Sequence, residues 1–240
     1  FINIISKDLI LGLKSVWYSA SPSSMNPELS SVYIYYDSGK IVFVATDSFR
    51  LAEKKISNRK IEEFESVLIP HKNVSEIIRI FEPTNGDIKI NFSDNQISFS
   101  SNGTYLTSRI VDGTFPDYKQ IIPKEHSSGA ILLKQDTISA FKVSNIFSDK
   151  FNQVTVEINK KEKYFQITTK NPDVGENVYK IDSAITGESL EMNFNYKYII
   201  DCFQSVLTDS VSFEMSKNKP MVIKGVGDPS FLYLVMSMNR

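Results

Sequence analysis

The sequence has very few of the residues that build disulfide frameworks and transition-metal sites. It contains one cysteine and two histidines. A single cysteine cannot form an intramolecular disulfide, which fits a reducing cytoplasm, and so few His and Cys side chains argue against a transition-metal site. Cys202 lies in the apolar stretch IIDCFQSV, so we expect a small buried side chain rather than a nucleophile. No metal or other cofactor is predicted.

Long apolar runs and an excess of one charge are absent as well. No stretch approaches the roughly 20 apolar residues of a membrane-spanning helix and no signal-peptide pattern opens the chain, so we expect a cytoplasmic protein without a membrane partner. The net charge is −1, so any nucleic-acid contact must come from a local cluster of basic residues. The chain has 240 residues and begins with Phe1; we expect two domains that form a piece of a longer protein.

Four stretches show the alternation of apolar and polar residues that predicts β-hairpins. They are VYIYYDSGKIVFVA with a turn at Ser38-Gly39, DIKINFSDNQISFSS with a turn at Asp94-Asn95, VTVEINKKEKYFQITTK with a lysine-rich turn, and VSFEMSKNKPMVIKG. In each stretch the apolar side chains point to one face of the strands, so that face is expected to be buried.

Four other segments have apolar residues at helical spacing. They are Ser6 to Ala20, Lys72 to Phe81, Lys134 to Phe147 and Tyr196 to Leu207. The third pattern is the weakest, because Lys142, Ser144 and Asn145 interrupt its apolar stripe. We expect these helices to alternate with the hairpins.

The same order of elements occurs twice along the chain. Helix, hairpin, helix, hairpin runs from residue 1 to 115 and again from residue 129 to 240. We therefore predict an α+β protein of two repeated domains, residues 1–125 and 129–240, each with two helices packed on antiparallel sheets. The join is placed in IIPKEHSSGA, where proline, charge and small residues replace the apolar pattern.

Two polar clusters are candidates for catalysis. One comprises Asp47, Ser48 and Arg50, and the other Asp112, Asp117 and Tyr118 around GTFPDY. Neither has the spacing of a nucleophile elbow, a phosphate-binding loop or a paired-carboxylate site, and Gly113 and Pro116 are typical of a turn. We predict no catalytic residue. A nucleotide-handling enzyme built on the first cluster stays as an alternative, which a bound phosphate or metal there would favour.

Each predicted helix carries basic residues opposite its apolar stripe. They are Lys7, Lys14, Lys72, Arg79, Lys142, Lys150 and Lys197. Within the first two helices the basic residues are seven positions apart, so they share one side. One such lysine is ordinarily a solvated side chain, but four helices of this kind in a protein of near-zero net charge favour a surface that binds a nucleic-acid backbone. No series of aromatic residues accompanies them, so single-strand stacking is not indicated.

Four further stretches match segments of one known protein family, in the same order and with the same spacing. They are ATDSFRLA (residues 45–52), DGTFPDYKQIIP (112–123), FNYKYIIDCF (194–203) and YLVMSMNR (233–240). They resemble, respectively, the Ala-Thr-Asp-Gly-His-Arg-Leu-Ala, Gly-x-Phe-Pro-Asp-Tyr, Phe-Asn-x-x-Tyr and Tyr-x-x-Met-Pro-Met-Arg segments of the bacterial sliding clamp, the beta subunit of DNA polymerase III. The resemblance covers almost the whole chain and corresponds to the second and third of that family's three clamp domains.

The resemblance implies a DNA polymerase processivity factor that encircles duplex DNA and is not itself an enzyme. It also implies a cleft between the two domains for short Gln-, Leu- and Phe-containing segments of the replicative polymerase, the clamp loader and repair polymerases. By matching position, the peptide-binding residues are Leu29, Thr46, Arg50, Leu51, Pro116, Ile121, Tyr198, Met221, Leu234, Met236 and Met238. Methionine and leucine suit an adaptable apolar cleft; for Leu51, Ile121 and Leu234, core packing is an equal alternative.

The chain also departs from the family pattern. Ser48-Phe49 stands where Gly-His is common, Gln120 where a basic residue is frequent, and Ser237 where a proline usually lies, so we expect altered partner affinity. A two-domain clamp that closes as a trimer, the archaeal and eukaryotic type, is the alternative, since chain length fits it although the motifs fit the bacterial type better. The resemblance implies that the full-length protein is a homodimer. Because the first clamp domain has no counterpart in this chain, we expect the chain by itself to be a monomer.

Overall fold

The computed structural model describes residues 1–58 and 62–238. The chain forms two compact units, Phe1–Asp117 and Tyr118–Arg240, and each is described by itself. The first unit ends at Asp117, eight residues before the expected domain end at residue 125. The boundary expected from the sequence marks a change in amino-acid composition. The boundary in the structure marks the point after which residues contact the second unit's residues more than those of the first. Asn239 and Arg240, which end the C-terminal motif, lie outside the described residues.

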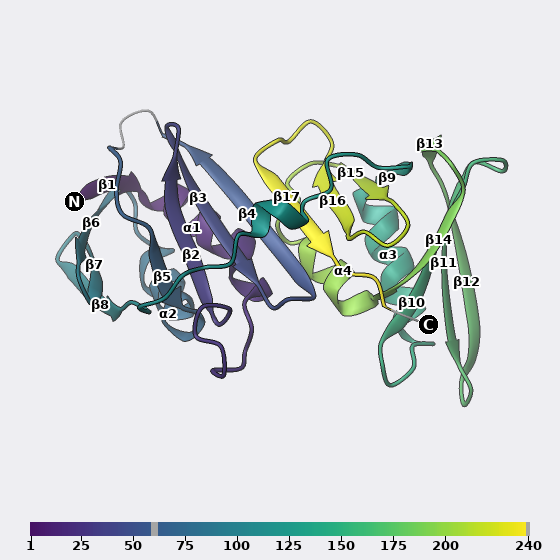
Figure 1. Cartoon of the computed structure of the whole chain (residues 1–240), viewed down its shortest axis with the longest axis horizontal. Coiled ribbons are helices and arrows are strands. Elements are labelled where there is room, and N and C mark those ends of the chain that lie inside the picture. Colours follow the sequence, from purple (N-terminus) through teal and green to yellow (C-terminus); the bar gives the residue numbers. More distant parts are fainter. Residues whose placement is uncertain (59–61, 239–240) are drawn as a thin grey trace. The chain divides into compact units, whose positions relative to one another are not determined.

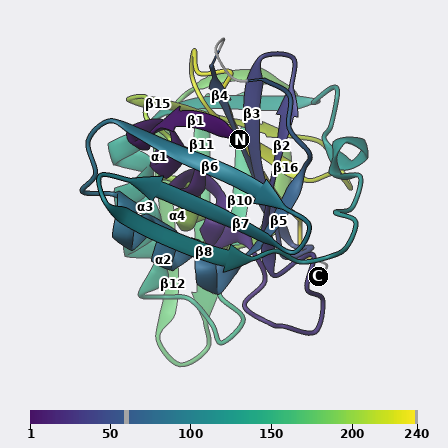
Figure 2. The same ribbon diagram turned by 90° about the vertical axis from the view of Figure 1, so that its left-hand side faces the viewer.

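The first unit contains eight strands and two α-helices among its described residues (Figure 1). The elements are β1 (Ile2–Ile5), α1 (Ser6–Val16), the 3₁₀ turn η1 (Trp17–Ser19), β2 (Ser31–Asp37), β3 (Lys40–Thr46), β4 (Arg50–Ser57), β5 (Val67–Pro70), α2 (His71–Phe81), β6 (Asp87–Ser93), β7 (Gln96–Ser101) and β8 (Thr104–Arg109). One sheet has the order β1-β6-β7-β8, and β6, β7 and β8 lie side by side across the front of the view in Figure 2. The other has the order β5-β2-β3-β4.

The second unit repeats this plan. Its elements are η2 (Tyr118–Ile121), β9 (Ser128–Leu133), α3 (Lys134–Asn145), β10 (Gln153–Asn159), β11 (Tyr164–Asn171), β12 (Gly175–Asp182), β13 (Ala184–Gly187), β14 (Leu190–Asn195), α4 (Tyr196–Cys202), β15 (Ser210–Met215), β16 (Met221–Gly225) and β17 (Phe231–Val235). The orders β9-β15-β16-β17 and β14-β10-β11-β12 correspond strand for strand to the two sheets of the first unit, with β13 added beside β9. The predicted α+β repeat of helices on antiparallel sheets is therefore confirmed.

All four predicted hairpins are present, with the expected turns. Asp37 pairs with Lys40 across Ser38 and Gly39, whose φ angles of 51° and 79° are those of a type I′ turn. The other three hairpins are β6–β7, β10–β11 and β15–β16. A fifth hairpin, β7–β8, was not predicted although Asn102-Gly103 is a typical turn signal and has φ angles of 49° and 80°.

Two helices are shorter than their apolar stripes predicted. The first ends as an α-helix at Val16 and tightens into η1, and the fourth ends at Cys202 instead of Leu207. Beyond Cys202 the backbone makes a turn in which Ser205 N–H donates to the Cys202 carbonyl at 2.9 Å. Val206 is buried after this turn while Leu207 is 61% exposed, so the apolar spacing continued past the end of the helix. α2 and α3 lie within two residues of their predicted bounds.

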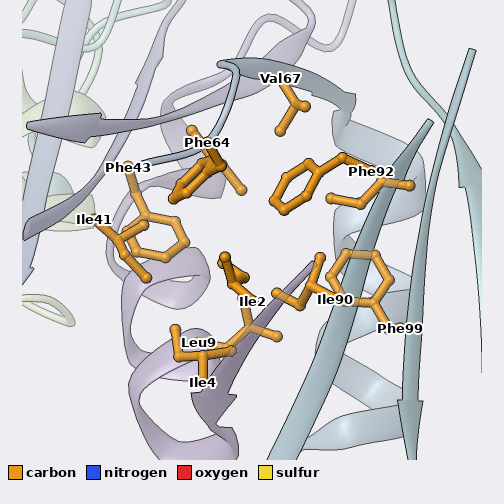
Figure 3. A pocket seen from close by; sticks show the side chains of 12 residues that line it. Ile2, Ile4, Leu9, Ile41, Phe43, Phe64, Val67, Ile90, Phe92 and Phe99 are labelled. Carbon is orange, nitrogen blue, oxygen red and sulfur yellow. The ribbon is translucent and has the colours of Figure 1, made fainter. Parts of the chain in front are cut away.

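The core of the first unit lies where both sheets meet α1. Figure 3 shows Ile41 and Phe43 of β3, Ile90 and Phe99 of the other sheet, and Leu9 of α1 pointing toward one another. They surround an entirely apolar cavity of about 10 Å³. A cavity of that size holds at most one water molecule, and an apolar lining gives a water no hydrogen-bond partner. This region is packed core and has no room for a ligand.

The second unit has an aromatic core that joins its helices to both sheets. The Phe165 and Phe213 rings lie 5.0 Å apart, between β11 and β15. Phe203, just after α4, lies 6.5 Å from Phe213 and 6.4 Å from Phe141 of α3. These contacts hold α3 and α4 together against the sheets and leave their polar sides exposed.

Candidate nucleic-acid interface and peptide-binding residues

The polar stretch from Thr46 to Arg50 is a hydrogen-bonded turn between β3 and β4. The Asp47 carboxylate accepts from the backbone N–H groups of Phe49 and Arg50, both at 3.0 Å, and pairs with Arg50 Nε at 3.0 Å. Thr46 Oγ1 donates to the Arg50 carbonyl at 2.6 Å and accepts from Ser48 N–H at 3.2 Å. Ser48 has a φ of 75°, so the turn stores some backbone strain that these bonds offset.

This geometry does not favour the enzyme hypothesis. A phosphate site needs backbone N–H groups and cations that face outward, but here the N–H groups of Phe49 and Arg50 already bind the Asp47 carboxylate. Within residues 1–58 and 62–238, no three His, Cys, Asp or Glu side chains are grouped so as to hold a metal ion. Tyr118 of the second polar cluster is buried.

Four expected peptide-binding residues of the second unit lie on α4, on β17 and in the segment after β17, namely Tyr198, Leu234, Met236 and Met238. Tyr233 of β17 donates its hydroxyl proton to the Tyr198 carbonyl of α4 at 2.9 Å. The chain then continues through Met236 to Met238, whose N–H donates to the Asn193 carbonyl of β14 at 2.8 Å. This segment therefore runs from β17 to the strand that precedes α4 (Figure 1). Met236 is 41% exposed, and Tyr198 and Met238 are half-buried.

Three of the expected peptide-binding residues are core residues. Leu51 of β4, Met221 of β16 and Leu234 of β17 are at most 1% exposed. A side chain with so little accessible surface cannot contact a peptide unless the fold rearranges. For Leu51 and Leu234 the core alternative is the one the structure supports, and Met221 joins them because it has no exposed surface.

The other expected peptide-binding residues are accessible to different degrees. Leu29 and Arg50 are half-buried and Pro116 is exposed. Ile121, in η2, is 47% exposed, which does not fit its core alternative. Thr46 is 7% exposed, and its hydroxyl is used within the turn. A peptide role for these five stays a prediction.

The basic residues of α1 and α2 are all exposed, but two of the four are paired with glutamates. Lys14 forms an ion pair with Glu82, and Arg79 Nη2 lies 2.6 Å from Glu76 Oε2. Exposed pairs of this kind contribute little stability, yet each lowers the positive charge that its helix presents. Lys7 and Lys72 form no ion pair with any other residue in the described ranges.

The basic residues of the second unit are exposed on neighbouring elements. Lys142 lies on α3, Lys150 in the loop after it, and Lys197 is the second residue of α4. Asn195 caps α4 by accepting from Lys197 N–H at 3.0 Å, a common reason for a helix to start there. None of the three lysines has an ion-pair partner in the part of the chain that the structure describes. α3 contacts α4, and the loop that carries Lys150 is bonded to the start of α4 through Asn152 and Tyr196, so the three lysines stand on elements that touch one another.

The protonation of Cys202 and of His71 is perturbed. Cys202 is fully buried, and burial, with the neighbouring Asp201 carboxylate, raises the pKa of its thiol. The prediction of a small buried side chain is confirmed, since a protonated thiol is a poor nucleophile. Burial and then the charge of Lys72 lower the pKa of His71, the first residue of α2, whose ring stacks on Trp17 at 5.1 Å.

No helix in the described residues is long and apolar enough to cross a bilayer.

The exposure of Phe151 was not predicted. Phe151 is 58% exposed and lies beside Lys150, whose Nζ is 5.0 Å from its ring centroid. The sequence signal was available: a phenylalanine between Lys150 and Asn152 in a segment with turn residues has no apolar stripe to join. The Glu82 partner of Lys14 could not be found in this way, because it is 68 residues away.

Two family models together match almost the whole chain. The model of the DNA polymerase III beta subunit, central domain, matches residues 3–117, and that of the DNA polymerase III beta subunit, C-terminal domain, matches residues 119–239. The boundary between them coincides with the boundary between the two structural units. Both matches are to the bacterial type of clamp and not to the trimeric alternative.

Individual relatives agree with these models. The beta sliding clamp of Staphylococcus aureus is 25% identical over 224 residues, which are 92% of this chain and 59% of that protein. The DNA polymerase sliding clamp of Bacillus subtilis has a TM-score of 0.94 at 24% identity and covers all of this chain and 64% of that one. The DNA polymerase III beta subunit of Thermotoga maritima has a TM-score of 0.92 at 25% identity, covering 99% of this chain and 65% of that one.

This chain thus spans about three fifths of the length of the S. aureus clamp. Its two units have the fold of the solved clamps, with the helix pairs and antiparallel sheets described above. The chain therefore belongs to the DNA polymerase III beta subunit family, whose central and C-terminal domains it matches.

Proposed function

We propose that this chain is part of a DNA polymerase processivity factor, a sliding clamp that holds its partners on duplex DNA. The observation that carries the proposal is the exposed basic surface of the helix pairs. Five lysines, Lys7, Lys72, Lys142, Lys150 and Lys197, are exposed and have no ion-pair partner in the described residues. They stand on both units of a chain whose net charge is only −1.

The chemistry of these side chains suits a tether that moves along DNA. Lysine is a compact, strongly hydrated charge on a flexible stem, and it binds phosphate oxygens without distinguishing the sequence. Each contact is weak and sensitive to salt, so a few of them keep the duplex in place without stopping its movement. The Asp47 cluster, the best enzyme alternative, uses its polar groups within its own turn, which supports a role in binding instead of catalysis.

The salt dependence of duplex binding tests this proposal. We expect the affinity for a short duplex, measured by fluorescence anisotropy, to fall linearly with the logarithm of salt concentration, and Lys72→Gln to reduce that slope by about 0.9. Lys219→Gln is the matched control, because Lys219 is exposed in the turn between β15 and β16, away from the helices. An equal effect of both substitutions, or no duplex binding at low salt, would contradict the proposal.

We further propose that Tyr198, Met236 and Met238 of the second unit contact short peptide segments of partner proteins. Met236 is 41% exposed although it follows a strand whose residues are otherwise mostly buried. An exposed methionine and a half-buried tyrosine supply a deformable apolar surface and a polar group, which suit Leu and Phe anchors of several partners. Leu29, Thr46, Arg50, Pro116 and Ile121 remain predicted contributors to the same recognition.

A peptide titration tests the methionine. We expect a Gln-Leu-x-Leu-Phe peptide to bind, and Met236→Ala to weaken it about fivefold, since covering part of a methionine side chain contributes about 1 kcal/mol. Met25→Ala is the matched control, because Met25 is 87% exposed in a loop of the first unit. Unchanged affinity of the Met236→Ala variant would remove this residue from the peptide site. Solution mass from light scattering tests the separate expectation that this chain is a monomer.

A further inference from the structure

The loop that follows α3 in the second unit presents an aromatic ring to solvent. This loop, Ser148–Gln153, connects α3 to β10. Phe151 is 58% exposed and Lys150 is exposed beside it, with Lys150 Nζ 5.0 Å from the centre of the ring. A phenylalanine left in water forgoes the stabilisation that burial would provide, so its position is not explained by the packing of the fold.

The backbone of this loop is held on both sides. Asp149 Oδ1 accepts from the N–H groups of Phe151 and Gln153, both at 3.0 Å. Asn171 at the end of β11 donates its side-chain amide to the Ser148 carbonyl at 2.8 Å. These bonds use the polar groups of the loop internally and leave the Lys150 and Phe151 side chains facing outward. The backbone that carries the ring is therefore held in place, which lowers the entropy lost when a ligand covers the ring.

The same loop is bonded to the start of α4, where another cation lies. Tyr196 N–H donates to the Asn152 carbonyl at 2.9 Å, and Lys197 is the next residue. Lys150 and Lys197 have no ion-pair partner in the residues that the structure describes. The nearest acid in the loop, Asp149, already accepts two backbone N–H groups. Lys150 and Lys197 outnumber the one carboxylate of the loop, Asp149, so the net charge of these three groups is positive and favours an anionic ligand with an apolar, flat component.

The first unit provides an internal comparison. There the aromatic residue after the first helix is Trp17, and its ring stacks at 5.1 Å on His71, the first residue of α2. His71 and Tyr196 are equivalent, since each begins the second helix of its unit and is followed by a lysine. One face of the Trp17 ring is occupied by protein, whereas the structure shows no ring stacked on Phe151 among the described residues.

We propose that Phe151 stacks on an unpaired base of single-stranded DNA while Lys150 and Lys197 bind the adjoining phosphates. The proposal rests on the proposed DNA-binding function and extends it to a second form of DNA. A base in a duplex already stacks on its neighbours, so the ring is of use only where a base is free to leave the stack. Stacking on an aromatic side chain accepts every base, and lysines follow the backbone, so this contact is independent of sequence.

Binding of an oligothymidylate of about 12 nucleotides, followed by NMR shift titration or fluorescence anisotropy, tests the inference. We expect Phe151→Ala to weaken single-strand binding about tenfold, equivalent to about 1.4 kcal/mol, and to leave duplex affinity within about twofold. Phe151→Tyr is expected to retain binding. Phe49→Ala is the matched control, because Phe49 is also a phenylalanine in a turn and is 60% exposed.

Salt dependence separates the ring from the cation. Lys150→Gln is expected to reduce the slope of log affinity against log salt by about 0.7 for the single strand, whereas Phe151→Ala should lower the affinity and leave the slope unchanged. Thermal unfolding of both variants at the wild-type temperature would show that the loop is intact, as expected for two exposed side chains.

Other outcomes would overturn the inference. Single-strand binding unaffected by Phe151→Ala would do so, and so would an equal loss for single strand and duplex, which indicates a backbone contact only. Loss of partner-peptide binding in this variant, without a change for DNA, would assign the loop to a protein partner. If the wild-type chain binds the single strand but no duplex, the proposed tether function fails and this inference stands. If it binds the duplex but no single strand, this inference fails and the proposed tether function stands.

Discussion

Replacing Gly12 by alanine sets two opposing effects against each other in the helix that carries Lys7 and Lys14. Alanine stabilises a helix interior by about 0.5–1 kcal/mol relative to glycine. A Cβ at Gly12, however, would lie within 2.6 Å of Phe43 Cδ2 and Cζ. Phe43 has no exposed surface and is enclosed by the side chains shown in Figure 3, so it cannot move aside. Overpacking of this kind costs about 1–3 kcal/mol, and we expect a net loss of about 1–2 kcal/mol.

The unique tryptophan makes this effect measurable in the first unit alone. Trp17 directly follows α1 and stacks on His71 of α2, so its fluorescence reports unfolding of that unit. With a urea dependence of about 2 kcal/mol per molar, the unfolding midpoint should fall by about 0.5–1 M. In a Phe43→Leu background the same substitution should cost at least 1 kcal/mol less, because about that much comes from the clash. A midpoint raised by Gly12→Ala, or an equal cost in both backgrounds, would refute the reasoning.

Two further predictions concern charge. Burial and Lys72 lower the pKa of His71 in the folded state, so the unfolded chain binds more protons than the folded chain as the pH falls through about 6.5. The urea midpoint monitored by Trp17 should therefore decrease as the pH is lowered through that range. His71→Gln should flatten this pH dependence. The same slope in His71→Gln would show that other groups cause it. Glu76→Gln removes the ion-pair partner of Arg79 and should raise duplex affinity a few-fold with a slope steeper by about 0.9; Glu162→Gln, exposed in the turn between β10 and β11, should not.

Local signals predicted the hairpins well because each rests on short-range chemistry. Ser38-Gly39 adopts the positive φ angles that its turn requires, and alternation then sets which strand face is buried. β12 had no such signal. Only Ile181 of its eight residues is buried, so it lacks the apolar alternation of a strand packed on a core, and its place is determined by pairing with β11. Such a strand depends on its neighbour, which a local pattern does not contain.

The candidate site was predictable to the extent that it depends on helix periodicity. The seven-residue spacing correctly placed Lys7 and Lys14 on the exposed side of α1. It did not show that Glu82 neutralises Lys14, since that pairing depends on how α1 packs near the end of α2. Family position likewise suggested Met221 and Leu234 as peptide contacts, but both side chains are buried, although the pairing of β16 with β17 puts them on opposite faces of the sheet. Exposure depends on tertiary packing, and sequence position alone does not determine it.

The turn from Thr46 to Arg50 keeps its shape independently of the side chain at position 49. Its shape depends on the Asp47 carboxylate, the Thr46 hydroxyl and the φ angle of Ser48. Phe49 contributes only its backbone N–H to that network, and its side chain is 60% exposed. A rigid turn that carries one side chain with no structural duty can accept many residues there without loss of stability. Position 49 can thus differ between related clamps while the hairpin itself stays the same, and under the proposed peptide-binding function such a difference would change partner preference.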